Sequence, residues 1–541
     1  MHDLPDSVDT AYEKILGKSK DHHRARHLLH LILAAKRPFS VEELALAMAF
    51  RRCPSHDQIT EETEPTERFR ATLRDLCGLM TVVVDDKVYL LHQTVKEFLV
   101  QSTEKSPSLP SPISWNHKFS VVQSNRLLAE TCLRYIDAYA SKACSDILCG
   151  YSLLHWTEHF READVEFPSD IATLGYRLCT PDSESFKTWV VLTEGASPLE
   201  SGFFPTDTPF LIASYFGLDA VLRQALDHRI NDVNTCDSAF TRMGPLSWAI
   251  FQGHESVVRM LHDTGKVDLM SRDGCGSPPL AHAADKGDES VVELLLGTGM
   301  VDINSRDDFG ETPLSAAALK GHDSVVKMLL DTGKVDIDSR DNEGRTPLAS
   351  AVYWGYESVV KMLLATGKVD LESRDNDGQT QMALAAKGGN DSVVKLLLAT
   401  GEVDLESRDN DGHTPMALAA KGGNDSVVKL LLATGEVDLE SRNKQGQTLL
   451  ALAAKGGNDS VVKLLLATGE VDLESRDNDG QTPLALAATA GWKRESVVKM
   501  LLDTGKVDMN SQDSDGKTPL SRAAAEGYDK LVEMMLESKS K

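Results

Sequence analysis

One segment of the chain has the residue types and spacing of a hydrolytic metal site. His155 and His159 are four residues apart, so one helix face would carry both imidazoles, and Glu158 could activate a zinc-bound water. Such a site also needs a third ligand in a cleft, which a short helix in a bridging segment does not obviously supply. A zinc hydrolase using residues 155–159 is therefore a minor alternative. We expect no catalytic residues, no metal site and no cofactor.

The glycines of the chain do not form a phosphate-binding or calcium-binding loop. The Gly-Lys pairs at 265, 333, 367 and 505 lack both the earlier Gly and the following Ser or Thr that a P-loop requires. A calcium loop starting at Ser373 would place Asp375 and Asp377 at ligand positions. It would also place Leu384 at the twelfth position, where calcium needs a bidentate Glu. The sequence therefore predicts neither phosphate binding nor calcium binding by these loops.

A 34-residue repeat dominates the second half of the sequence. Residues 382–408 recur unchanged at 416–442 and with one substitution at 450–476. In the unit that starts at Gly310, Thr312 is placed to cap a first helix over about 313–320, with Pro at its first position. Gly321 ends this helix, and a second helix carries Val-Val-x-x-Leu-Leu before a turn-rich excursion. Identical units offer the same chemistry repeatedly, which suits binding better than catalysis.

A single unit cannot be stable alone. Its four large apolar side chains contribute gross burial of about 8 kcal/mol, whereas ordering each residue of the backbone costs roughly 1–2 kcal/mol. Stacking on neighbouring units supplies the missing burial. The repeat therefore predicts an α-solenoid.

The unit Gly-x-Thr-Pro-Leu-x-x-Ala-Ala-x-x-Gly-His, followed by Val-Val-x-x-Leu-Leu, closely resembles the ankyrin repeat. The resemblance covers roughly residues 206–541 and about ten units. It implies antiparallel helix pairs, protruding hairpins and a concave face built from hairpins and first helices. One departure is that the family's usual His after Thr-Pro-Leu is replaced by Ser or Ala, as at Ser315 and Ala349.

Three sets of residues are candidates for contacting a protein partner. Hairpin arginines recur in register and form a ladder that either grips a partner or pairs with Asp of adjacent hairpins to hold the stack. Leucines in a variable slot of the first helices predict an apolar strip in the groove. A Trp at a two-residue insertion in the ninth unit is either a binding anchor or folds back on its own helices. These candidates are Arg374, Arg408, Arg442, Arg476, Leu384, Leu418, Leu452, Leu486 and Trp492.

The N-terminal residues have the pattern of a small separate domain. Helical periodicity over 23–36 is followed by Ser40 and Glu43, which form a capping box for the next helix. A helix over 66–78, two strands around Asp85 and Asp86, and a closing helix from 94 complete the pattern. Helices followed by a β-hairpin indicate a winged helix.

This segment resembles the winged-helix region that follows the nucleotide-binding domain in fungal NACHT-type and other NLR-like receptors. The resemblance rests on AAKRPFSVEELALAMA and YLLHQTVKEFL. In such receptors a His in the place of His92 senses the phosphate of the bound nucleotide. The nucleotide-binding motif is missing from this chain, so the alternative for His92 is a core or hairpin histidine.

Together these features predict a mainly α chain. An ankyrin-repeat solenoid would follow a winged-helix-like domain and a helical bridge with helices around 125–139, 151–163 and 185–192. The expected domains are 1–101 for the winged helix, 102–115 for a Pro/Ser-rich linker, 116–205 for the bridge and 206–541 for the array.

Composition narrows the range of partners. The formal net charge of −25 argues against nucleic acid and favours a protein with basic patches. DNA binding by the winged helix is a further alternative, with residues 22–27 as its basic cluster. There is no membrane-length apolar run and no secretory signal, and the eight cysteines lack CxxC spacing. A cytoplasmic protein is expected, with the nucleus as the alternative.

We therefore expect a non-enzymatic scaffold that recognises a protein partner. By resemblance, the chain looks like the sensing and regulatory part of a fungal NLR-like receptor without its nucleotide-binding domain, which it could contact intramolecularly in a longer protein. A free-standing cytosolic ankyrin adaptor is the alternative. A nucleotide-binding domain encoded immediately upstream would distinguish them.

Overall fold

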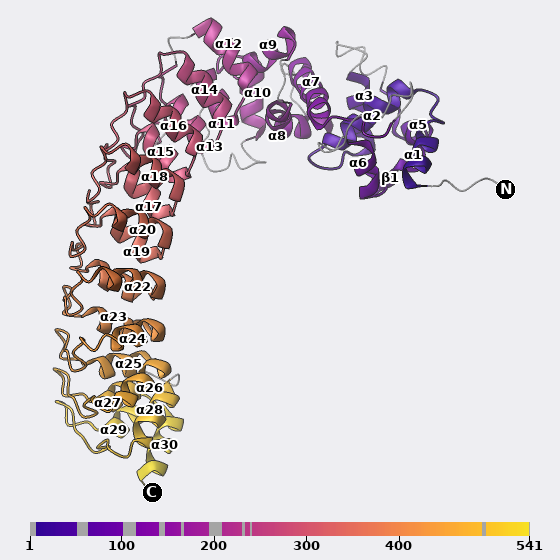
Figure 1. Cartoon of the computed structure of the whole chain (residues 1–541). Helices are drawn as coiled ribbons and strands as arrows, with labels where there is room; N and C mark the ends of the chain where they lie inside the picture. Colours follow the sequence, from indigo (N-terminus) through magenta and orange to yellow (C-terminus); the bar gives the residue numbers. More distant parts are fainter. Residues whose placement is uncertain are drawn as a thin grey trace. The chain divides into compact units, whose positions relative to one another are not determined.

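The protein is mainly α, as predicted. The computed structural model describes residues 7–50, 63–100, 115–139, 147–163, 167–193, 208–229, 233–238, 241–489 and 494–539 (Figure 1). Contacts within the chain separate it into two compact units, Met1–Gly274 and Cys275–Lys541. In the described part of the chain, no helix has both the length and the apolar character needed to cross a membrane.

The first unit begins with helices that surround a β-hairpin. The helices are α1 (Val8–Leu16), α2 (His22–Ala34), α3 (Val41–Phe50), α5 (Thr66–Cys77) and α6 (Gln93–Leu99). Between α5 and α6, β1 (Thr81–Val84) and β2 (Lys87–Leu90) pair in antiparallel register. Asp85 and Asp86 make the turn, with φ of 47° and 62°. The predicted order of helices, hairpin and closing helix is therefore confirmed.

The predicted capping box at the start of α3 is present. Glu43 N donates to Ser40 Oγ at 3.0 Å, and Glu43 Oε2 accepts from Ser40 N at 2.7 Å. The two carboxylate oxygens of Glu43 also accept from the Arg37 guanidinium at 2.9 and 2.5 Å. This buried carboxylate thus fixes the start of α3 against the segment that follows α2.

Four helices follow the hairpin domain. They are α7 (Val121–Tyr139), α8 (Ile147–Glu162), α9 (Ser169–Leu178) and α10 (Glu184–Thr193). α7 packs on both α8 and α2, and His30 Nδ1 of α2 lies 2.8 Å from Ser124 Oγ of α7. Trp156 of α8 meets Trp189 of α10 edge to face, with ring centroids 5.2 Å apart. Three of these helices match the predicted bridge, and α9 was not predicted.

Pairs of short helices follow in the first unit and make up all the helices described in the second. In the first unit they are α11 (Pro209–Phe216) with α12 (Asp219–Arg229) and α13 (Pro245–Gln252) with α14 (Glu255–Asp263). In the second unit the first helices of the pairs are α15 (Pro279–Lys286), α17 (Pro313–Lys320), α19 (Pro347–Trp354), α21 (Gln381–Gly388), α23 (Pro415–Gly422), α25 (Leu449–Gly456), α27 (Pro483–Thr489) and α29 (Pro519–Ala525). The second helices are α16 (Glu289–Gly297), α18 (Asp323–Asp331), α20 (Glu357–Ala365), α22 (Asp391–Thr400), α24 (Asp425–Leu432), α26 (Asp459–Thr468), α28 (Glu495–Asp503) and α30 (Asp529–Lys539).

The second unit is a stack with two helical layers. Each first helix contacts the next first helix, and each second helix contacts the next second helix. Figure 1 shows the pairs following one another, with the connecting loops gathered along one side. This arrangement is the predicted solenoid.

Local sequence explains where the helices begin and end. Thr312 Oγ1 accepts from Ser315 N and caps α17, and Pro313 occupies the first helical position. Gly321 ends α17 with φ of 73°, a conformation that costs glycine little. In α18, Val325, Val326 and Leu329 are at most 1% exposed. The predicted helix over 313–320 and its apolar partner are confirmed.

Gln381 stands where most units have Pro at the first helical position. Its side chain is 1% exposed. Its Nε2 donates to Ser373 Oγ at 2.8 Å, whereas its Oε1 has no hydrogen-bond partner within the described residues. Thr380 before it has φ −82° and ψ 173°, which a residue before Pro adopts readily. Because Pro restricts the unfolded chain, Gln381→Pro should raise the free energy of unfolding by ~0.5–1 kcal/mol, measured by urea denaturation.

The matched control is Pro415→Gln, at the equivalent position of the next unit. It should lower the urea midpoint, because it adds chain entropy and a buried amide. Shifts of the same sign in both variants would contradict this account of the helix start.

Candidate protein-interaction surface

The hairpin arginines bind backbone carbonyls of the next repeat. Nη1 of each arginine donates to the carbonyl of the equivalent residue one repeat further on, at 2.6 Å in four successive contacts. The donor and acceptor residues are Arg374 to Arg408, Arg408 to Arg442, Arg442 to Arg476, and Arg476 to Gln512. The alternative in which these arginines hold the stack fits this geometry. Their acceptors are backbone carbonyls, not the Asp side chains that the sequence suggested.

The acidic residues of the hairpins also join neighbouring repeats. Glu372 Oε1 accepts from Asp404 N at 2.9 Å, and Glu440 Oε1 accepts from Asp472 N at 2.7 Å. In the same way, Glu474 Oε1 accepts from Asp508 N at 2.7 Å. Burial raises the pKa of Glu474 above its usual range. Much of the negative charge on the hairpins is therefore committed to the array itself.

A further ladder of hydrogen bonds lies at the turn between the two helices of each pair. Asn424 Nδ2 donates to the Ala386 carbonyl at 2.8 Å, and Asn458 Nδ2 donates to the Ala420 carbonyl at 2.7 Å. His322 Nε2 lies 2.8 Å from the Asp285 carbonyl, in the place of Asn. These side chains satisfy carbonyls at the ends of the preceding first helices.

The four leucines of the first helices are buried, which corrects the expected apolar strip. Leu384, Leu418, Leu452 and Leu486 are 3, 6, 4 and 4% exposed. Their helices pack on the preceding and following first helices. Each leucine therefore fills space between adjacent first helices, at a position that holds Ala316 and Ser350 in two earlier units. They stabilise the stack and offer little area to a partner. Trp492 lies outside the described residues.

An aromatic pair that the sequence reading missed is exposed at the end of α19. Tyr353 and Trp354 are 39 and 58% exposed, and their rings meet at 89° with centroids 5.4 Å apart. The copied repeats have Lys-Gly at these two positions, as at Lys387 and Gly388. The signal in the sequence was this replacement of a polar pair by two aromatics.

Acidic side chains gather in the repeats that lead to α19. Glu311 is half-buried, and burial together with the carboxylates of Asp307 and Asp341 raises its pKa above the usual range. Arg345 Nε donates to Asp341 Oδ2 at 3.0 Å and partly neutralises the group. Carboxylates therefore gather in the hairpins that precede α19.

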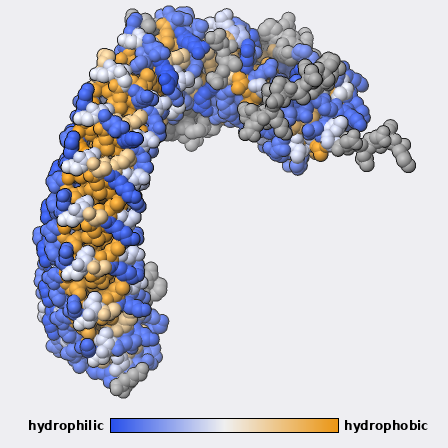
Figure 2. All heavy atoms as spheres, in the orientation of Figure 1, coloured by the Kyte–Doolittle hydropathy of each residue, from blue (hydrophilic) through white to orange (hydrophobic). Residues whose placement is uncertain are grey.

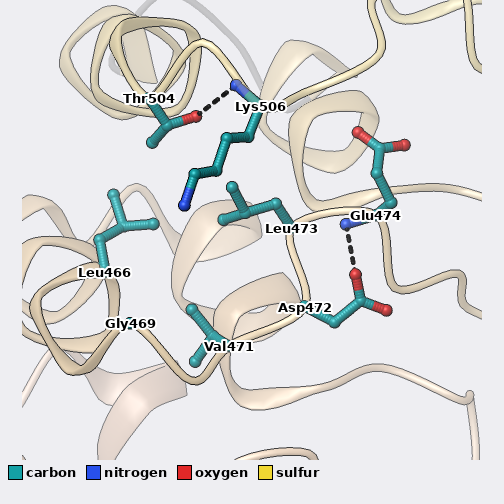
Figure 3. A pocket seen from close by; sticks show the side chains of 8 residues that line it. All are labelled: Leu466, Gly469, Val471, Asp472, Leu473, Glu474, Thr504 and Lys506. Carbon is teal, nitrogen blue, oxygen red and sulfur yellow. Dashed lines mark hydrogen bonds between the residues drawn. The ribbon is translucent and has the colours of Figure 1, made fainter.

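A cavity of about 440 Å³ opens between the ends of α26 and α28. Leu466, Val471 and Leu473 give it apolar walls, and the side chain of Lys506 from the next repeat reaches over them (Figure 3). Its lining mixes these apolar side chains with a cation and two carboxylates. It is thus a polar-edged groove between two repeats.

The HxxEH segment forms a hydrogen-bonded core on α8. His159 is fully buried, with Nε2 at 2.8 Å from Tyr151 Oη and Nδ1 at 2.7 Å from Asn125 Oδ1. Both of its ring nitrogens are therefore engaged, and a metal could bind only by displacing one of these partners. His155 is half-buried, with Nδ1 3.8 Å from Glu158 Oε2. Among the described residues no three His, Cys, Asp or Glu side chains are grouped to hold a metal ion.

His92 lies at the surface and caps α6. Its Nδ1 accepts from Thr94 N at 3.2 Å, and the side chain is exposed. The histidine is thus at the start of a helix that follows the hairpin, and not in the core. Its nucleotide-sensing role remains a proposal.

The stacked helix pairs, with hairpins joined by repeated hydrogen bonds, define an α-solenoid whose class is that of protein-interaction modules. The chain belongs to the ankyrin-repeat family. The family described as "Ankyrin repeats (3 copies)" matches residues 210–307, 280–375, 367–443, 423–513 and 450–541. Residues 12–108 match the family described as "GPI inositol-deacylase, winged helix domain".

Two curated fungal proteins are similar to parts of the chain. The "Azaphilone pigments biosynthesis cluster protein L" of Monascus ruber is 25% identical over 295 residues, which are 49% of this chain and 60% of that protein. The "Vegetative incompatibility protein HET-E-1" of Podospora anserina is 26% identical over 111 residues, which are 20% of this chain and 8% of that protein. The chain thus covers less than two thirds of either relative.

Loss of one hairpin arginine should weaken the coupling between two repeats. Arg408 Nη1 donates to its own loop at Gly412 and to the Arg442 carbonyl of the next repeat, at 3.0 and 2.6 Å. Arg408→Gln should lower the free energy of unfolding by ~1 kcal/mol, because two carbonyls lose a charged donor. Lys395→Gln, on an exposed helix face, should change it by less than ~0.5 kcal/mol. Equal effects of both changes in urea denaturation would contradict the ladder's role.

Acidification should destabilise the first unit through His159. Burial lowers the pKa of His159 from 6.5 to about 3, so the unfolded chain takes up a proton below pH 6.5 that the folded chain refuses. Stability is therefore lost as pH falls from 6.5 towards 3, by up to ~1.4 kcal/mol per pH unit.

The measurement is urea denaturation of the wild type and His159→Gln between neutral and mildly acidic pH. The variant should be less stable at neutral pH, since the Tyr151 and Asn125 contacts change, but its stability should fall less steeply on acidification. Parallel pH profiles would rule out His159 as the titrating group.

Proposed function

We propose that the array recognises a protein partner through the first-helix face, with Trp354 as the principal anchor. The carrying observation is the 58% exposure of Trp354 beside the partly exposed Tyr353. Trp and Tyr are enriched among residues that dominate binding energy at protein interfaces. The arginines and leucines considered above are already engaged within the stack, whereas this pair has surface to offer.

The charge beside α19 favours a partner with a basic patch. Asp307, Glu311 and Asp341 lie in the two repeats that include and precede α19. The chain as a whole carries a formal net charge of −25. A cationic side chain of the partner could rest on the Trp354 ring while others approach the carboxylates.

We further propose that the N-terminal domain couples this recognition to a nucleotide-binding domain in an NLR-like system. The winged-helix match over residues 12–108 and the partial similarity to the incompatibility protein support this role. His92 is exposed, so a nucleotide held by another domain could reach its imidazole. A free-standing adaptor remains the alternative, and it would use the same array surface.

Trp354→Ala should remove most of the affinity for the partner. Truncating a central Trp anchor costs ~2 kcal/mol or more, which is a loss of at least ~30-fold in Kd. Proteins retained by the immobilised full chain but lost with Trp354→Ala would be identified by mass spectrometry, and their Kd measured by calorimetry.

The control is Leu536→Ala, which removes another exposed apolar side chain on the last helix. This variant should retain the partner with unchanged Kd. Equal retention of every partner by Trp354→Ala and the wild type would show that binding does not depend on the first-helix face at α19.

A further inference from the structure

A second surface of the array runs along the ends of the second helices. It consists of a leucine near the end of each second helix and a valine in the loop that follows, all half-buried. We name this surface the outer seam; its central residues are Leu330, Val335, Leu364, Val369, Leu398, Val403, Leu432, Val437, Leu466 and Val471. Figure 2 shows apolar residues gathering in a band along this part of the chain, with polar residues on either side.

The cavity in Figure 3 shows how one charged side chain sits over this seam. Lys506 comes from the loop that follows α28, and its side chain reaches back over Leu466 and Val471 of the preceding repeat. Residues equivalent to Lys506 precede the seam valine in every unit of the second half. Each repeat therefore places one variable residue beside the apolar seam.

The charge of this variable residue changes sign along the array. From the unit of α18 onward, successive units of the stack carry Lys334, Lys368, Glu402, Glu436, Glu470 and Lys506. The first four side chains are exposed, and within the described residues none of the four has an ion-pair partner. The Asp that follows the valine is constant, and it is already bound to its own loop: Asp404 Oδ1 accepts from Glu406 N at 2.9 Å. The sign changes between Lys368 and Glu402 and changes back between Glu470 and Lys506. The centre of the seam thus has a basic half, Lys334 and Lys368, followed by an acidic half, Glu402 and Glu436.

We propose that the outer seam is a self-complementary interface through which two copies of this chain associate antiparallel. A twofold axis between the repeats of Lys368 and Glu402 pairs Lys368 with Glu402 of the second copy, and Lys334 with Glu436. Each pair then occurs twice, because a twofold interface is isologous. A parallel, in-register arrangement would instead place like charges opposite each other at all four positions.

The spacing of the repeats keeps the proposed contacts in register along both copies. Neighbouring second helices of a stack lie roughly 8–10 Å apart, and both copies have the same spacing because they have the same repeat. The leucines and valines of the two seams would then face each other beside the row of charge pairs. The apolar contact supplies the driving force, and the charges select the register and the antiparallel direction.

Charge reversal in the full-length chain tests this interface. Sedimentation analysis of the wild type at low ionic strength should show a dimer that weakens as salt is added. Lys334→Glu with Lys368→Glu should be monomeric at the same concentration, with Kd raised at least ~10-fold, and Glu402→Lys with Glu436→Lys should behave likewise. The quadruple variant, in which all four charges are exchanged, should dimerise again.

Two further samples make the test specific. An equimolar mixture of the two double variants should form a heterodimer, since the four positions are then all acidic in one variant and all basic in the other. Lys387→Glu with Lys421→Glu changes the same number of charges on the first helices and should leave the dimer intact. Circular dichroism of each variant checks that the helices are retained.

The proposal is overturned by a wild-type chain that stays monomeric at low salt at high protein concentration. It is also overturned if the quadruple variant and the mixture both fail to associate while their helices are intact. Dimers that survive both double variants would assign self-association to another surface. A seam that binds only a different protein would appear as a monomer in these experiments and would reject the second copy as its occupant.

Discussion

Burial of apolar side chains between neighbouring helix pairs is the interaction on which the array depends. Val325, Val326 and Leu329 are almost fully buried in α18, but one pair alone presents too little apolar area to offset the entropy of ordering its backbone. Each pair becomes ordered only against the pairs before and after it. Stability is thus a property of the stack, and every surface available for binding is a by-product of that stacking.

The same constraint explains why most of the repeated polar residues are unavailable to partners. A stack leaves carbonyls and N–H groups at each hairpin and helix end, and repeated Arg, Glu and Asn side chains satisfy them across the repeat boundary. What differs between repeats is then the best guide to recognition. Trp354 and the charged residues of the outer seam stand out because the same positions carry different residues in other repeats.

The N-terminal half follows a different principle, in which buried polar groups are satisfied one by one. His159 bridges Tyr151 and Asn125, and Glu43 joins Ser40 to Arg37. Such networks fix the relative positions of particular helices, since an unpaired buried polar group is costly. The segment at 155–159, whose sequence pattern resembles a metal site, instead connects α8 to α7 through the contact of His159 with Asn125.

The sequence by itself determined the period, the helix starts at Thr-Pro, the helix ends at Gly and the winged-helix order, because these depend on local conformational preferences and on hydrophobic spacing. It did not determine which repeated residues are exposed. The sequence pattern predicted a surface strip of Leu384 and its equivalents, but these leucines are buried. The distance between adjacent first helices decides how large a side chain fits between them, and the sequence does not give that distance. One alternative from the sequence paired Arg408 with an Asp, but Arg408 binds the carbonyl of Arg442. Only the stacking of repeats brings that carbonyl within reach. Exposure and pairing across repeats are set by neighbours 34 residues away, and only the tertiary structure places those neighbours.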